Sequence, residues 1–90
     1  MSIVSVKELD NSTFEVMVQA ATTTTHIVTV PPDYAAKLTA GRVTVDQLVS
    51  HSFDFLLERE PNTSILRRFD LPVIMHYFPE YEQKIEKILA

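Results

Sequence analysis

Apolar and polar residues alternate along the N-terminal third of the chain, as in β-strands with one buried face. Every second side chain between residues 14 and 20 is apolar: Phe14, Val16, Val18 and Ala20. At a period of two these side chains share one face of a strand. Residues 3–9 are rich in β-branched residues, and Asp10-Asn11-Ser12 has the composition of a turn, so the sequence predicts a hairpin. A third antiparallel strand is expected over residues 26–30, ending at Pro31-Pro32, which lack the N–H donors to extend a sheet.

The pattern becomes helical beyond the two prolines. Residues 34–40 are long enough for two helical turns, and Gly41, the only glycine in the chain, suits the left-handed conformation that ends a helix. Thr44 and Gln47 have the spacing of a capping box. Apolar side chains then follow at helical intervals as far as Pro61, which predicts the longest helix of the protein.

Short helices are predicted for the C-terminal third. One is expected over residues 64–69, and another begins at Asp70. Because proline interrupts a helix, Pro79 divides the last segment. We expect one helix to end near Tyr77 and another to run from Pro79 to about Leu89.

Together these elements predict an α+β fold, in which an N-terminal three-stranded antiparallel β-meander precedes three to four helices packed on one face. Ninety residues provide one hydrophobic core, so we expect a single domain over residues 1–90. A hydrophobic fraction of 46% with 22% charged residues argues against disorder. A chain of this size buries only about two thirds of its surface on folding, so a homodimer would add useful burial.

Composition excludes several classes of protein. With no cysteine, the chain has neither disulfides nor thiolate chemistry. No apolar run approaches the roughly 20 residues that cross a bilayer, and the first residues lack a secretion signal, so the predicted location is the cytoplasm, without a membrane. The net charge of -4 argues mildly against binding nucleic acid through its phosphates.

The titratable residues form no motif of catalysis or metal binding. His26, His51 and His76 fall on three different expected elements, which favours structural or solvent-facing roles. His51 lies one helical turn from Asp54, but its serine neighbours in sequence point in other directions. There is no nucleophile elbow, glycine-rich phosphate loop or carboxylate pair. We therefore expect a protein that is not an enzyme and carries no metal or cofactor.

Aromatic residues crowd the helical part of the chain: Phe53, Phe55, Phe69, Tyr77, Phe78 and Tyr81. Phe55 falls about 100 degrees or more from the apolar stripe of the longest helix. The C-terminal helices can bury it by packing on both sides of that helix. Alternatively, Phe55 with Tyr77 or Phe78 forms a patch for a protein partner or for self-association. The sequence thus favours a non-enzymatic protein-interaction module.

Residues 25–60 contain a strand, prolines, a short helix, a glycine and a capped helix, in an order that resembles ribbon-helix-helix regulators. The matching stretch is HIVTVPPDYAAKL, residues 26–38. In such proteins two paired strands read bases in the major groove. The resemblance implies, as the alternative function, a DNA-binding regulator or antitoxin component with Thr25, Ile27 and Thr29 as DNA contacts. The first helix is short for that family, and these three side chains include no cation or amide.

A second stretch, SFDFLLEREPNTSILRRFDL at residues 52–71 followed by YFPEY at residues 77–81, resembles a family of small uncharacterised bacterial proteins. No activity comes with this resemblance. It implies a bacterial, cytoplasmic, stand-alone domain.

Overall fold

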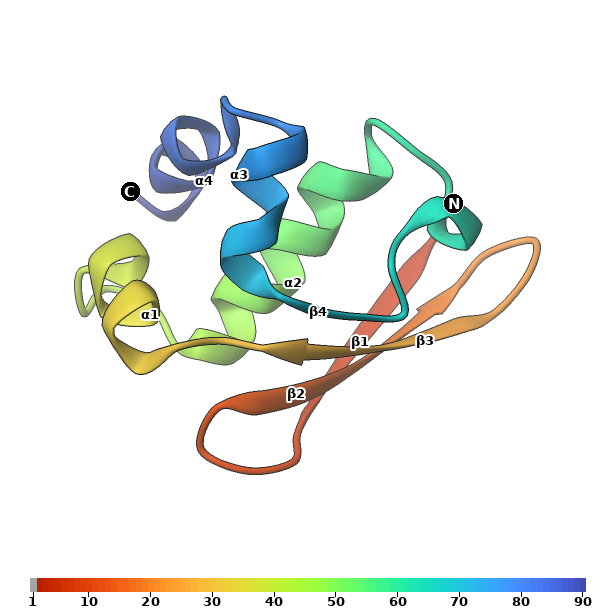
Figure 1. Cartoon of the computed structure of the whole chain (residues 1–90), viewed down its shortest axis with the longest axis horizontal. Coiled ribbons are helices and arrows are strands. Elements are labelled where there is room, and N and C mark those ends of the chain that lie inside the picture. Colours follow the sequence, from red (N-terminus) through yellow and green to blue (C-terminus); the bar gives the residue numbers. More distant parts are fainter. Residues whose placement is uncertain (1) are drawn as a thin grey trace.

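A computed structural model describes residues 2–90 as a four-stranded sheet with helices on one side of it (Figure 1). The strands are β1 (Ile3–Glu8), β2 (Thr13–Gln19), β3 (Thr24–Thr29) and β4 (Arg68–Asp70), in the spatial order β1-β2-β3-β4. The helices are α1 (Pro32–Thr39), α2 (Val45–Leu57), α3 (Ile74–Tyr77) and α4 (Tyr81–Leu89), with 3-10 turns at Asn62–Ser64 and Leu71–Val73. The predicted α+β class is confirmed.

The predicted meander is present as β1, β2 and β3, which pair antiparallel. Its hairpin turn forms as expected, with the Ser12 N–H donating to the Asp10 carboxylate at 2.9 Å. The inward side chains of β2 are Phe14, Val16 and Val18, and all of them are buried. Alternation along this strand therefore marked the core face correctly for these three residues, whereas Ala20, the fourth residue of the pattern, lies beyond the strand and is exposed.

The sequence predicted three strands and a short helix over residues 64–69, and the structure corrects both expectations. The last two residues of that segment, Arg68 and Phe69, instead belong to β4, which lies parallel to β3. The Ile27 N–H donates to the Arg67 carbonyl at 2.7 Å, and Phe69 is buried between two exposed neighbours. A helix this short is unstable alone. The open edge of β3 offers hydrogen bonds and a buried place for Phe69.

The predicted start of the longest helix is confirmed, whereas the helix ends at Leu57, before Pro61. Thr44 and Gln47 form the capping box: the Gln47 N–H donates to Thr44 Oγ1 at 3.2 Å, and the Thr44 N–H donates to Gln47 Oε1 at 3.0 Å. The preceding helix α1 ends in left-handed backbone at Ala40 (φ 50°) and Gly41 (φ 73°). These contacts fix where α2 starts and how it enters the core.

One hydrophobic core fills the space between the sheet and the helices. Helix α2 lies at its centre, with Leu48, Val49 and Phe53 buried. Tyr81 of α4 is buried too, and its hydroxyl is 2.6 Å from Ser52 Oγ, which itself donates to the Leu48 carbonyl at 2.7 Å. Tyr81 is therefore the donor to Ser52, and α4 is hydrogen-bonded to α2 inside the core.

Among the described helices of residues 2–90, none combines the length and the apolar character that a bilayer crossing requires.

Candidate functional site

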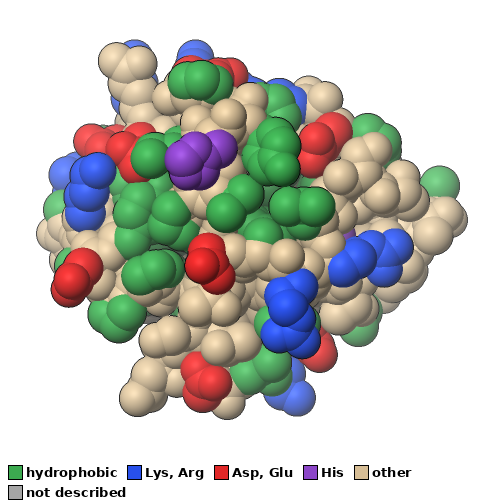
Figure 2. All heavy atoms as spheres, in the orientation of Figure 1, with side chains coloured by type: hydrophobic (Ala, Val, Ile, Leu, Met, Phe, Trp, Pro, Cys, Tyr) green, Lys and Arg blue, Asp and Glu red, His purple; other side chains and the backbone are tan. Residues whose placement is uncertain are grey.

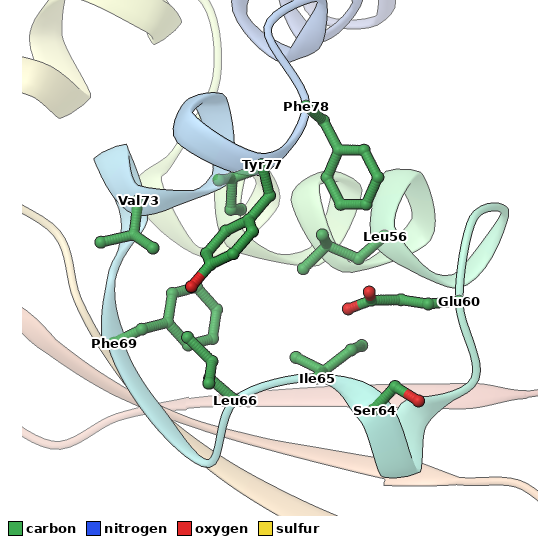
Figure 3. Close-up of a pocket in the computed structure, with 10 residues that line it drawn as sticks. Leu56, Glu60, Ser64, Ile65, Leu66, Phe69, Val73, Tyr77 and Phe78 are labelled. Carbon is green, nitrogen blue, oxygen red and sulfur yellow. The ribbon is translucent and has the colours of Figure 1, made fainter.

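Hydrophobic side chains gather over α3 on the face shown in Figure 2. There a pocket of about 140 Å³ opens between α3, the end of α2 and the loop that leads to β4 (Figure 3). Tyr77 and Phe78 lie on one side of it, and Ile65 and Leu66 lie on the other. Apart from Glu60 and Ser64, the side chains that line it are apolar or aromatic. We call this hollow the α3 pocket.

The loop wall of the α3 pocket is held by a chain of hydrogen bonds to β3. The Asn62 amide donates to the Thr22 carbonyl at 2.7 Å and to Thr24 Oγ1 at 2.8 Å. Thr24 Oγ1 lies 2.8 Å from Nε2 of His26, and Nδ1 of His26 lies 2.8 Å from the Leu66 carbonyl oxygen. The position of the wall therefore depends on residues far away in the sequence.

The same hydrogen bonds determine the tautomer of His26. A carbonyl oxygen only accepts, so Nδ1 must carry the proton that reaches Leu66. Nε2 then accepts from the Thr24 hydroxyl. Burial lowers the pKa of His26, which favours this neutral form. His26 is thus a hydrogen-bonded structural residue, packed against Phe53 with ring centroids 5.3 Å apart.

The three aromatic residues of the predicted patch have different positions. Tyr77 is 66% exposed at the rim of the α3 pocket, and Phe78 is half-buried in its wall. Phe55, for which the sequence left open either burial by the C-terminal helices or a place in the patch, is only 1% exposed. Its ring meets Phe78 and Tyr81 edge-on, with centroids 5.9 and 5.3 Å away. The C-terminal helices cover this side of α2, so Phe55 supports the pocket wall from beneath instead of contacting a partner.

Sequence reasoning missed the opposite wall of the pocket. Leu66 is 48% exposed and faces Tyr77 across the opening. It was assigned to a helix that does not form. The signal in the sequence is the polar, apolar, polar order of Arg68-Phe69-Asp70, which suits a strand but spans only three residues.

Glu60 is the charged side chain in the lining of the α3 pocket. Its carboxylate points into the space between the two apolar walls (Figure 3). Burial raises the pKa of this carboxyl above its ordinary value. A second hollow of about 320 Å³ lies beside Pro61 and Asn62, and Glu60 borders both. Glu60 thus combines a charge with an apolar environment.

The residues of the alternative DNA-binding function lie on the outer face of the sheet. Thr25 is exposed, and Ile27 and Thr29 are half-buried. However, β3 is an interior strand that pairs with β2 on one side and with β4 on the other. A ribbon-helix-helix protein needs this strand free to pair with its copy in a dimer. Nothing in the geometry favours that arrangement.

The other histidines do not converge with His26. His51 is partly exposed and lies 3.8 Å from the Asp54 carboxylate, and His76 is exposed on α3. Across residues 2–90, no group of three or more His, Asp or Glu side chains could hold a metal ion.

Comparison of the chain with protein-family models, with curated proteins and with solved structures found no match. The resemblance of residues 52–81 to small bacterial proteins therefore stays a prediction. The function has to be argued from the α3 pocket itself.

Proposed function

We propose that this domain is a non-enzymatic protein-interaction module that binds its partner through the α3 pocket. The observation that carries the proposal is the size of the pocket together with the exposed Tyr77 at its rim. The partner is another protein or a second copy of the chain. A cytoplasmic, bacterial setting remains part of this proposal.

The volume of the pocket favours a single side chain as its occupant. Sites for cofactors and drug-sized ligands usually measure about 300–1,000 Å³. The α3 pocket, at about 140 Å³, is smaller. An apolar cavity of about 150 Å³ in another protein accepts one benzene ring. The α3 pocket thus matches one aromatic or branched aliphatic side chain from a partner.

The rim has the composition of a binding hot spot. Tyr77 and Leu66 expose apolar surface on opposite sides of the opening. Covering such surface is favourable by about 25 cal/mol per Å². Tyrosine is enriched among the residues that dominate interface energies. Behind the rim, Phe78 rests on the buried Phe55, so the wall is held in place before binding and less entropy is lost.

The test is an NMR titration of the methyl-labelled protein with the peptides acetyl-Ser-Phe-Gln-Ser-amide and acetyl-Ser-Ala-Gln-Ser-amide. We expect the phenylalanine peptide alone to shift the methyl signals of Leu56, Ile65 and Leu66. Leu66→Ala should weaken these shifts at the other two residues. Ile88→Ala is the matched control, because Ile88 on α4 is 47% exposed and lies outside the pocket. Absence of shifts with both peptides, or equal weakening by the two variants, would refute the proposal.

A further inference from the structure

Glu60 is the starting point for a more specific statement about the partner. Its carboxylate lies among side chains such as Leu56, Ile65 and Phe78, which cannot hydrogen-bond to it. A carboxylate in apolar surroundings loses part of its hydration and gains stability when a cation approaches. The raised pKa of Glu60 is due to burial alone. No lysine, arginine or histidine is among the residues that line the α3 pocket.

The neighbouring Arg59 is engaged elsewhere. The Arg59 guanidinium donates to the Phe55 carbonyl at 3.0 Å and to the Glu80 carboxylate at 3.4 Å, and it lies 3.6 Å from the centroid of the Phe55 ring. Within residues 2–90, no ion pair or side-chain hydrogen bond is formed by Glu60.

We infer that the α3 pocket recognises a partner segment in which a large apolar side chain lies next to a lysine or arginine. The apolar side chain fills the space between Tyr77 and Leu66, and the cation meets the Glu60 carboxylate at the edge. This inference rests on the proposed function and adds the chemistry of the partner to it. Pairing a partly desolvated carboxylate with a cation also discriminates against neutral and acidic segments.

Charge favours a different protein over a second copy of this chain as the occupant. The chain carries 12 acidic and 8 basic residues, with a net charge of -4. Two like-charged copies repel each other, whereas a basic segment is attracted to the domain and to Glu60.

The experiment compares peptides and variants that isolate the charge. Acetyl-Ser-Phe-Lys-Ser-amide and acetyl-Ser-Phe-Gln-Ser-amide are titrated into the methyl-labelled protein at low salt. We expect the lysine peptide to bind about twofold to fivefold more tightly, since a partly exposed ion pair contributes modestly. Glu60→Gln should remove this preference, so that the variant binds the two peptides equally.

Glu58→Gln is the matched control, because it changes the net charge equally and Glu58 is 72% exposed beside the pocket loop without lining the pocket. It should retain the preference for lysine. Equal binding of the two phenylalanine peptides, or the same loss in both variants, would overturn the inference and leave the proposed function intact. Absence of binding by both phenylalanine peptides would refute the proposed function as well.

Light scattering of the protein alone tests the other possible occupant of the α3 pocket, a second copy of the chain. We do not expect to find a dimer that forms as the protein concentration rises and that the Tyr77→Ala variant fails to form. Such a dimer would assign the α3 pocket to a second copy and overturn the inference.

Discussion

Nδ1 of His26 donates to the carbonyl oxygen of Leu66 over 2.8 Å, between residues 40 positions apart in the chain. This contact joins the central strand β3 to the loop that forms one wall of the α3 pocket. Because His26 is buried, water cannot replace the bond if the imidazole is removed. Stability and the shape of the pocket therefore depend on the same side chain.

Replacing His26 with alanine is expected to lower the free energy of unfolding by about 2–4 kcal/mol. The change leaves a cavity beside Phe53 and removes the partners of Thr24 and Leu66. Urea denaturation followed by circular dichroism measures the loss. His76→Ala is the control, because an exposed side chain should change stability by less than about 0.5 kcal/mol. Similar values for the two variants would contradict the structural role of His26.

The stability of the protein should fall with decreasing pH, starting near the ordinary histidine pKa of 6.5. The pKa of His26 is lowered in the folded state, so between that lowered value and 6.5 the unfolded chain binds a proton that the folded chain does not. Above 6.5 both states are neutral and the contribution vanishes. Unfolding free energies measured at pH 7.5, 6.5 and 5.5 test this.

The variant His51→Ala should keep that pH dependence, since His51 is partly exposed beside Asp54. The same measurements are made in the Glu60→Gln variant, because Glu60 has the opposite effect on the pH dependence of stability. Its raised pKa makes the folded state bind a proton more readily than the unfolded state. A flat profile between pH 7.5 and 5.5 in that variant would contradict the assignment of a neutral His26.

Local patterns in the sequence predicted the elements that depend on neighbouring residues. Phe14, Val16 and Val18 alternate within one strand, and Thr44 with Gln47 forms a contact inside a single turn. The core face of β2 and the capping box were both predicted correctly, because each follows from the spacing of residues that are close in sequence.

Elements that depend on distant residues were not predicted. Strand β4 exists because Arg67 and Phe69 meet an open edge of β3, and three residues carry too weak a pattern of their own. The α3 pocket is still harder to predict from the sequence, because Asn62 and His26 position its loop wall through tertiary hydrogen bonds. Of the predicted patch, Tyr77 lies at the surface. Phe55 is buried, and its burial depends on where α4 packs, which the sequence pattern does not give.

The hydrogen bond between Ser52 and Tyr81 should show strong coupling between the two side chains. Ser52→Ala leaves a buried tyrosine hydroxyl without its acceptor and should cost about 1–3 kcal/mol. Tyr81→Phe removes the donor but leaves Ser52 bonded to the Leu48 carbonyl, so it should cost less. The double variant is expected to be more stable than the sum of the single effects predicts. Unfolding free energies of all four proteins measure this, and additive effects would show that the bond contributes nothing.

The last prediction separates the two aromatic residues that the sequence grouped together, Phe55 and Tyr77. Phe55→Ala should destabilise the fold by about 3–5 kcal/mol, because Phe55 is buried against Phe78, Tyr81 and the Arg59 guanidinium. Tyr77→Ala should change stability by less than about 0.5 kcal/mol, since most of its side chain is in water. Its effect should appear in the peptide titration, as a loss of the shifts at Ile65. The opposite result, with Tyr77→Ala unfolding the domain and peptide binding surviving in Phe55→Ala alone, would mean that the α3 pocket is part of the core and not a binding surface.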